Sequence, residues 1–215
     1  MQKNDDQAPK PPLIPDVLSK EVPPGFLSDE QVYDALDLGK TGLSNIRVRQ
    51  AKIKDSKFTG IDLSLAELKK IEISHTRFTN CNFANTKMRE SNTERVEFIS
   101  CQMMGVDFSE GILAHIRFVD CRINLSNLRF AALKNITFEN CDLREADFLN
   151  AKLRNINFEG CDLSSAQFAN ANCNEVDFRT SRISGIKVQA ENLTGMIIGT
   201  DQIMDIARLF GVEIR

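Results

Sequence analysis

An internal repeat of five residues dominates this sequence. Stepping by five from Leu43 to Leu193 gives 31 positions, of which 30 are apolar, with Thr93 the one exception. Because only 42% of all residues are apolar, chance does not produce such a run. A short, fixed period is typical of solenoid proteins, in which each repeat packs on its neighbours. The repeat therefore constrains the fold more strongly than any other feature of the chain.

The composition within each repeat predicts a short strand followed by a corner. Two residues before each apolar centre, the 29 positions from Ile46 to Ile186 hold only Ala, Ser, Thr, Cys, Gly, Val or Ile. Alternate side chains of a strand point to the same face, so the small residue and the centre both face inward. The residue between them faces outward, and the remaining two residues must turn the chain. Each pentapeptide is thus expected to form one side of a coil.

Residue types also recur every twenty positions, which predicts four sides per coil. One such column is Cys81, Cys101, Cys121, Cys141 and Cys161, and another is Phe58, Phe78, Phe98, Phe118, Phe138, Phe158 and Phe178. Neighbouring strands lie about 4.8 Å apart, so like residues should stack directly above one another. We expect an all-β solenoid, a quadrilateral β-helix of about eight coils and roughly 37 Å in length.

Segments such as CDLRE, ADFLN, AKLRN, CDLSS and AQFAN resemble the pentapeptide-repeat proteins, a bacterial family. The pattern of that family is a small residue, a polar residue, Leu or Phe, and two variable residues. The resemblance extends from residue 43 to residue 198 without a break in register. It implies that the β-helix is right-handed. It implies little about function, because most members of the family have no assigned biochemical role.

The first 24 residues differ in composition from the rest of the chain. All six prolines lie there, so residues 1–24 are predicted to be a disordered or extended Pro-rich tail. The sequence shows no secretory signal peptide and no stretch near the roughly 18 apolar residues of a membrane span. We therefore expect a cytoplasmic protein that does not contact membranes. Its six cysteines should be reduced in that compartment.

Both ends of the repeat region 43–198 are expected to carry helical caps, because a solenoid exposes an open core at each end. Ser28, followed by Asp29, Glu30 and Gln31, resembles a capping box and predicts a helical cap over residues 25–42. Residues 199–215 are predicted to form a second helical cap and tail. Its helix should end at Gly211 and should place these residues on one face: Ile203, Ile206, Ala207 and Phe210.

The sequence predicts no catalytic, cofactor-binding or metal-binding residue. The cysteine column occupies small inward positions, where free Cys acts as a small hydrophobe, and it lacks the spacing of a zinc site. His75 and His115 share an outward column two coils apart, roughly 10 Å by strand spacing, which is too far to share a metal ion. We expect both to be solvated surface residues. A straight solenoid also offers no concave site, so an enzyme is not expected.

Charge is distributed unevenly along the repeat. Residues 43–100 carry 11 basic and 7 acidic side chains, whereas residues 101–198 carry 10 and 12. Six basic residues flank one column of centres, with only Glu67 and Glu90 to offset them. They form a candidate anion or partner surface: Arg47, Arg49, Lys69, Lys70, Lys87 and Arg89.

A second candidate surface consists of apolar residues at outward positions within two successive coils. Exposed apolar residues are common singly, but a cluster indicates a binding surface. Because these five lie on more than one side, a single contiguous patch is only one of the possible arrangements. The candidate apolar interface is Ile99, Met104, Val119, Leu125 and Phe130.

We expect a non-enzymatic interaction or scaffold module that presents its flat sides to another macromolecule. A protein is the favoured partner and nucleic acid is not expected; a homodimer through a terminal cap is a further possibility. The alternative is modulation of DNA gyrase, which the resemblance to quinolone-resistance members of the family implies. Those relatives imitate the acidic DNA duplex, whereas residues 43–198 carry 21 basic and 19 acidic side chains and no inserted loop.

Overall fold

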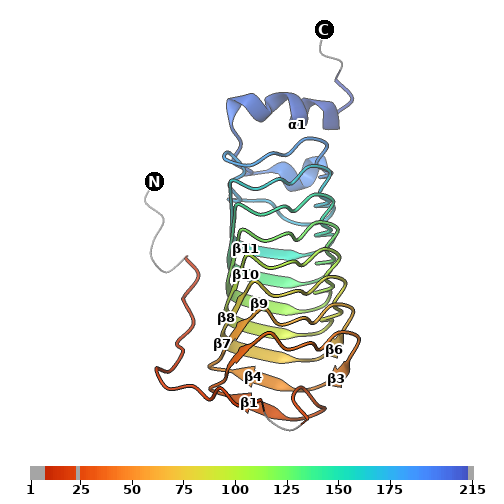
Figure 1. Ribbon diagram of the computed structural model, residues 1–215. Coiled ribbons are helices and arrows are strands. Elements are labelled where there is room, and N and C mark those ends of the chain that lie inside the picture. Colours follow the sequence, from red (N-terminus) through yellow and green to blue (C-terminus); the bar gives the residue numbers. More distant parts are fainter. Residues whose placement is uncertain (1–7, 23–24, 213–215) are drawn as a thin grey trace.

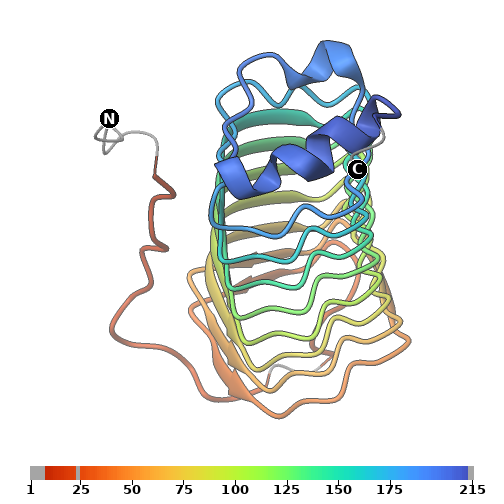
Figure 2. The ribbon, with the colours of Figure 1, turned by 90° about the horizontal axis from the view of Figure 1, so that it is seen from above.

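The repeat winds the chain into a four-sided stack of coils, which we call the tower. A computed structural model describes residues 8–22 and 25–212 (Figures 1 and 2). Parallel strands pair with a shift of twenty residues, so that Ile136 lies opposite both Ile116 and Ile156. The structure is therefore the expected right-handed quadrilateral β-helix, with like residues stacked along each side.

Strand length differs between the sides of the tower. Five strands of eight residues bend around one corner and cover two sides: β7 (Glu72–Thr79), β8 (Asn92–Ile99), β9 (Ile112–Val119), β10 (Ala132–Glu139) and β11 (Lys152–Glu159). The lower coils contain strands of three residues: β1 (Val32–Asp34), β2 (Asp37–Gly39), β3 (Arg47–Arg49), β4 (Lys52–Lys54), β5 (Lys57–Thr59) and β6 (Glu67–Lys69). On the other two sides, single bridges such as Gln102 to Arg122 and Asn127 to Asp147 join most of the coils.

The number of coils differs slightly from the expectation of about eight. The continuous ladder runs β1-β4-β7-β8-β9-β10-β11 and makes six full turns from its first strand to its last. Above β11, single bridges from Asn157 to Asp177 and from Asp177 to Ile197 continue the same column. The upper coils thus keep the stacking but lack regular strands.

The corners between Asn45 and Glu175 all have a left-handed backbone conformation. All 27 residues at steps of five from Asn45 to Glu175 have φ between +47° and +69°. None of these residues is β-branched, and many are Asn, Asp or Gly, which adopt this conformation at the lowest cost. Larger residues such as Leu125 (φ +59°) and Phe130 (φ +59°) adopt it as well. This conformation explains why the corner position accepts side chains of different sizes but contains no β-branched residue in these repeats.

Aromatic stacks fill the core, as the sequence predicts. Neighbouring rings of the column from Phe58 to Phe178 have centroids 4.8–5.3 Å apart and planes within 19° of parallel. A second stack, Phe148 on Phe168, meets Phe158 edge to face. Both geometries are favourable for aromatic pairs, so the rings add to the stability gained by burying them.

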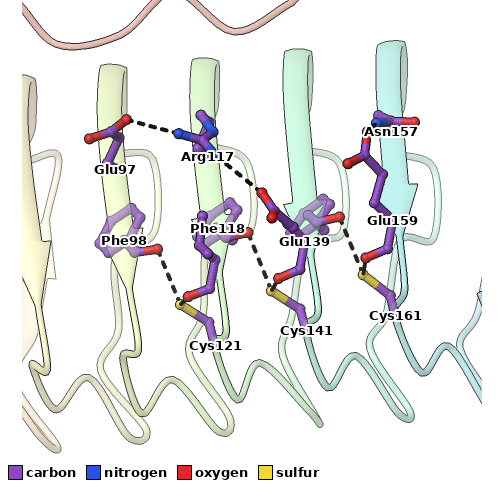
Figure 3. Close-up of polar contacts among 12 residues, drawn as sticks. Glu97, Phe98, Arg117, Phe118, Cys121, Glu139, Cys141, Asn157, Glu159 and Cys161 are labelled. Carbon is purple, nitrogen blue, oxygen red and sulfur yellow. Dashed lines mark hydrogen bonds and ion pairs between the residues drawn. The ribbon is translucent and has the colours of Figure 1, made fainter.

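The six cysteines are buried, free thiols. Each thiol of the main column contacts the carbonyl oxygen of a phenylalanine in the coil below; Cys121 Sγ lies 3.3 Å from Phe98 O and Cys141 Sγ 3.4 Å from Phe118 O (Figure 3). Burial raises the pKa of Cys173 to about 12, so this thiol stays protonated at neutral pH. The cysteines thus pack as small core residues.

The structure corrects the predicted N-terminal helix. In place of a helix over residues 25–42, strands β1 and β2 pair with β4 and β5, and Tyr33 and Leu38 occupy two buried centres. The capping box does not form, because the Ser28 hydroxyl donates to Gly25 O and does not cap a helix; Asp29 Oδ1 accepts a hydrogen bond from Arg49 N–H (2.8 Å) in the next coil. The five-residue repeat simply begins earlier. Its small position holds Gln31 and Leu36 in these sides, which hides the pattern in the sequence.

A helix does form in the predicted C-terminal segment, where α1 (Ile203–Leu209) lies across the top of the tower (Figures 1 and 2). It follows two 3₁₀ turns, η2 (Ala190–Leu193) and η3 (Thr200–Gln202). The chain leaves the helix at Gly211, whose φ of +69° is typical of a residue just beyond a helix end.

The buried face of α1 is rotated from the predicted one. Gln202 is buried, and Ile206 and Leu209 pack against the core, whereas Ile203 and Phe210 are exposed. Gln202 Nε2 donates to the carbonyl oxygens of Phe178 (2.7 Å) and Ser181 (2.6 Å). This polar residue closes the last coil, a role that a hydrophobic pattern does not reveal.

The described part of the N-terminal tail, residues 8–22, is an extended chain beside the tower (Figure 1). Ser19 N–H donates to Ala35 O (2.7 Å), and Asp37 N–H donates to Ser19 O (2.7 Å). These two hydrogen bonds attach the tail to the lowest coil. Residues 1–7, 23–24 and 213–215 lie outside the described residues. Within the described residues, none of the helices has the length and apolar character needed to traverse a bilayer.

Candidate interaction surfaces

The six predicted basic residues lie together on one side of the tower, which we call the basic face. Strands β3 and β6 place Arg47 opposite Glu67 and Arg49 opposite Lys69, and a bridge joins Glu67 to Lys87 in the next coil. All six basic side chains are exposed around a buried column of centres. Coil stacking thus unites residues that are up to 42 positions apart in the sequence.

Three carboxylates partly neutralise the basic face. Glu67 lies between Lys87 (2.8 Å) and Arg47 (3.4 Å), and Glu90 pairs with Lys69 (3.2 Å) and with Lys70 (3.4 Å). The ammonium groups of Lys87 and Lys69 lower the pKa of Glu67 and Glu90, respectively, so both carboxyl groups stay ionised.

The third carboxylate, Glu110, escaped the sequence prediction. Its Oε1 lies 2.7 Å from Arg89, and the contact raises the pKa of that guanidinium. Glu110 is 21 residues from Arg89, so the twenty-residue coil spacing is the signal that could have found it. The six cationic groups outnumber the three carboxylates that pair with them; Asp29, which accepts from Arg49 N–H, and Asp107, opposite Lys87 in the next coil, add negative charge at the two ends of the face.

The least neutralised part of the basic face is a shallow hollow. Arg49, Gln50, Lys69 and Lys70 line it. Within the described residues, the Arg49 guanidinium has no ion pair, whereas both lysines share the single carboxylate of Glu90. Three cationic groups that converge with one carboxylate between them favour binding of an anionic group.

The five predicted apolar residues do not form one patch. Ile99 and Val119 are half-buried neighbours on β8 and β9. Met104 (44% exposed) and Leu125 (52%) lie near a second corner, and Phe130 (56%) lies at a third. Because each step of five residues moves the chain to the next side, closeness in sequence does not place residues on the same side.

Sequence reasoning missed one prominent apolar residue, Ile112, which is 57% exposed on β9 opposite Ala132. It occupies the outward position before a repeat centre, where most repeats carry a polar residue. A search of that position alone for large apolar residues would have found it.

A second cluster of charges, on strands β7 to β10, is satisfied within the tower. The Glu97 side chain is only 6% exposed; its carboxylate lies 2.7 Å from Arg77 and 3.4 Å from Arg117. Arg117 also reaches Glu139 at 3.1 Å, as Figure 3 shows. These cross-strand pairs stabilise neighbouring coils and leave little unpaired charge on this side.

The sequence analysis expected both histidines to be solvated surface residues, but each of them contacts the N-terminal tail. His75 and His115 each accept a hydrogen bond from a backbone N–H group of the N-terminal tail. In the described part of the chain, no group of three or more His, Cys, Asp or Glu side chains is arranged to hold a metal ion.

Comparisons with known proteins agree with the geometry. A family model described as "Pentapeptide repeat region" matches residues 51–128 and 91–168, which together exceed half of the chain. No curated protein matches the sequence. A solved structure of trypsin-treated QnrB1, a plasmid-mediated fluoroquinolone resistance protein, is 16% identical, covers 85% of this chain and 99% of its own, and has a TM-score of 0.42.

A second solved structure is HetL, a pentapeptide repeat protein involved in heterocyst differentiation regulation, from the cyanobacterium Nostoc sp. strain PCC 7120. It is 14% identical, covers 74% of this chain and 85% of its own, and has a TM-score of 0.33. The family match over residues 51–168, with the twenty-residue columns and the four-sided coil, shows that this chain belongs to the pentapeptide-repeat family.

Proposed function

We propose that this protein is a non-enzymatic interaction module that binds an acidic surface of another protein through its basic face. The observation that carries the proposal is the cluster of Arg49, Lys69 and Lys70 on one flat side, where Glu90 is the one carboxylate that forms ion pairs with these cations among the described residues. A flat side with uneven charge suits recognition of a complementary protein surface. Catalysis instead needs groups that converge in a concave site, whereas the cationic groups of the basic face lie along a flat side.

The chemistry of the core fits action in the bacterial cytoplasm. All six cysteines are free and buried, as is usual for a protein of a reducing compartment. The basic face also opposes imitation of DNA, because a DNA mimic presents negative charge at the contact. Modulation of gyrase by mimicry therefore gains no support from the charge distribution.

The proposal includes self-association through the C-terminal cap. Ile203, Met204 and Phe210 are exposed on the outer side of α1, where three large apolar side chains face solvent. Burial of such residues in a symmetric contact would stabilise a dimer. Sedimentation velocity of the wild-type chain and of the Ile203→Asp, Phe210→Asp double variant tests this part. A dimer that dissociates in the variant supports it, and a wild-type monomer at all concentrations contradicts it.

Affinity capture from the native host lysate tests the basic face. The first variant combines Arg49→Glu, Lys69→Glu and Arg89→Glu, and a second carries Phe130→Asp at the apolar candidate. The matched control reverses three exposed charges on other sides of the tower, with Arg122→Glu, Lys152→Glu and Arg182→Glu. Circular dichroism and thermal unfolding show whether each variant keeps the tower.

We expect the wild type and the control to recover the same partner and the first variant to lose it. The Phe130→Asp variant reports whether the apolar corner contributes to the same contact. Unchanged recovery by both test variants would contradict the proposed surfaces.

A further inference from the structure

One corner of the tower carries a column of polar side chains that no part of the proposed function uses. We call it the corner column; from the bottom upward its members are His75, Arg95, His115, Asn135 and Asn155. They lie at the bend of the long strands β7 to β11, twenty residues apart, and all have φ between +47° and +57°. Neighbouring members therefore lie one coil apart along the tower axis.

The N-terminal tail contacts this column through its backbone. Leu13 N–H donates to His75 Nδ1 (3.0 Å), and Lys10 N–H donates to His115 Nδ1 (3.2 Å). The tail thus runs upward from Ser19 toward its N-terminus, and both Figure 1 and Figure 2 show it alongside the same side of the tower. Main-chain donors make both contacts, so the column recognises backbone conformation more than side-chain identity.

The spacing of these contacts matches a polyproline II helix. Such a helix has three residues per turn and rises about 3.1 Å per residue, so Lys10 and Leu13 should lie about 9.3 Å apart on one face. The two histidines are two coils apart, or about 9.6 Å at the usual strand spacing. Pro9, Pro11 and Pro12 have no N–H group, and they lie between and beside the two residues that donate to the histidines. The Pro-rich segment and the tower therefore have matching periods.

The other polar side chains of the corner column are only partly satisfied by hydrogen bonds to one another. Asn155 Nδ2 donates to Asn135 Oδ1 (2.8 Å), and the Asn135 amide lies within 3.4 Å of the His115 ring. Between the two histidines, Arg95 Nε is buried and lies 3.8 Å from Glu94 Oε1, and it makes no hydrogen bond among the described residues even with the tail in place.

We propose that the corner column is a binding site for proline-rich segments in the polyproline II conformation, and that residues 8–13 occupy it in cis. The inference rests on the proposed function as an interaction module and names a second class of partner for it. The partner is a proline-rich segment of another protein with free N–H groups three residues apart, and it displaces the tail. The tail then acts as an internal competitor at high effective concentration.

Docking at His115 should depend on pH, because this ring accepts from Lys10 N–H at Nδ1 and must be neutral to do so. The charged groups that act on His115 are Lys10 of the tail, Glu94 and Arg95 of β8, and Lys134 of β10. Asp55 and Arg95 occupy the corner positions below and above His75. Burial, followed by the charges of Lys10 and Arg95, lowers the pKa of His115. Docking is therefore complete above that pKa and is lost as the pH falls through it.

The test uses the full-length chain and a labelled synthetic peptide of residues 6–17. The double variant Lys10→Pro, Leu13→Pro removes both donors of the internal tail but keeps its polyproline conformation. The Ile14→Pro variant is the matched control, because it adds a proline without removing a docked N–H group. Peptide binding is measured through the fluorescence anisotropy of its label, and NMR of the imidazole signals locates the contact in the variants that keep both histidines.

We expect the peptide to bind the double variant about tenfold more tightly than it binds the wild type or the control, since only there is the column vacant. Binding should disappear at pH 5 and when His75→Phe and His115→Phe are added. Equal affinity for all variants, equal binding of a scrambled peptide, or binding that persists without the histidines would overturn the proposal. The experiment involves no residue of the basic face, so its failure would leave the capture experiment unaffected.

Discussion

At the residue scale, stability depends on two positions of the pentapeptide that have opposite requirements. The centre must be large and apolar, because four centres per coil fill the core in stacked layers. The corner must adopt positive φ, and it tolerates Leu, Phe, His and Arg at a conformational cost. Substitutions at the two positions should therefore act through different physics, packing at one and backbone conformation at the other.

The change Phe138→Ala tests the packing of the centre. This ring is buried between Phe118 (4.8 Å) and Phe158 (5.2 Å), so its removal leaves a cavity in the stack. We expect the free energy of unfolding to fall by about 3–5 kcal/mol in urea titrations. The exposed corner variant Phe130→Ala is the control and should change stability by less than about 1 kcal/mol. Similar losses in both would contradict a tightly packed core.

The change Asn150→Val tests the corner. Asn150 has φ of +55°, a region that β-branched residues avoid. We expect a loss of about 1–2 kcal/mol in unfolding free energy, whereas Asn150→Gly should be tolerated nearly unchanged. If valine and glycine have equal effects at this position, backbone conformation is not what limits the corner.

At the element scale, the sides of the tower follow the five-residue repeat, whereas its two ends do not. The sequence therefore predicted the sides better than the ends. The five-residue period predicts the sides and the register between residues 43 and 198, because each inward position carries its own apolar or small signature, but regular strands end at Glu159. The period failed to reveal β1 and β2, where Gln31 and Leu36 replace small residues. At the other end, Gln202 is buried and Leu209 of α1 packs against the core, whereas the hydrophobic pattern predicted that Ile203 and Phe210 would face the core.

The change Gln202→Ala tests the C-terminal cap. Its amide satisfies two carbonyl oxygens of the last coil and also accepts from Gly199 N–H (2.8 Å). Leaving those carbonyl groups buried without donors should cost about 1–3 kcal/mol. Hydrogen exchange should accelerate over residues 173–198 and stay slow in β8 to β10. The neighbouring exposed variant Asp201→Ala is the control. Uniform acceleration along the tower would show that the cap acts globally instead.

At the scale of the whole molecule, coil stacking determines which predicted surfaces exist. The basic residues recur at intervals near twenty and therefore share one side, whereas the apolar residues within two coils lie at three different corners. The docking of the tail could not be predicted from the sequence. Its contacts are made by backbone N–H groups three residues apart, and such contacts leave no hydrophobic pattern. Charge spacing was thus readable from the sequence, and the backbone contacts of the tail were not.

The salt dependence of partner binding tests the central claim, that an excess of positive charge on one side carries the interaction. The Debye length falls from about 10 Å at 0.1 M salt to about 3 Å at 1 M, so exposed charges are then largely screened. With the captured partner, we predict that the dissociation constant of the wild type rises at least tenfold over this range. The Arg49→Glu, Lys69→Glu, Arg89→Glu variant should bind weakly at low salt. Equal, salt-independent affinities for the two proteins would contradict the account.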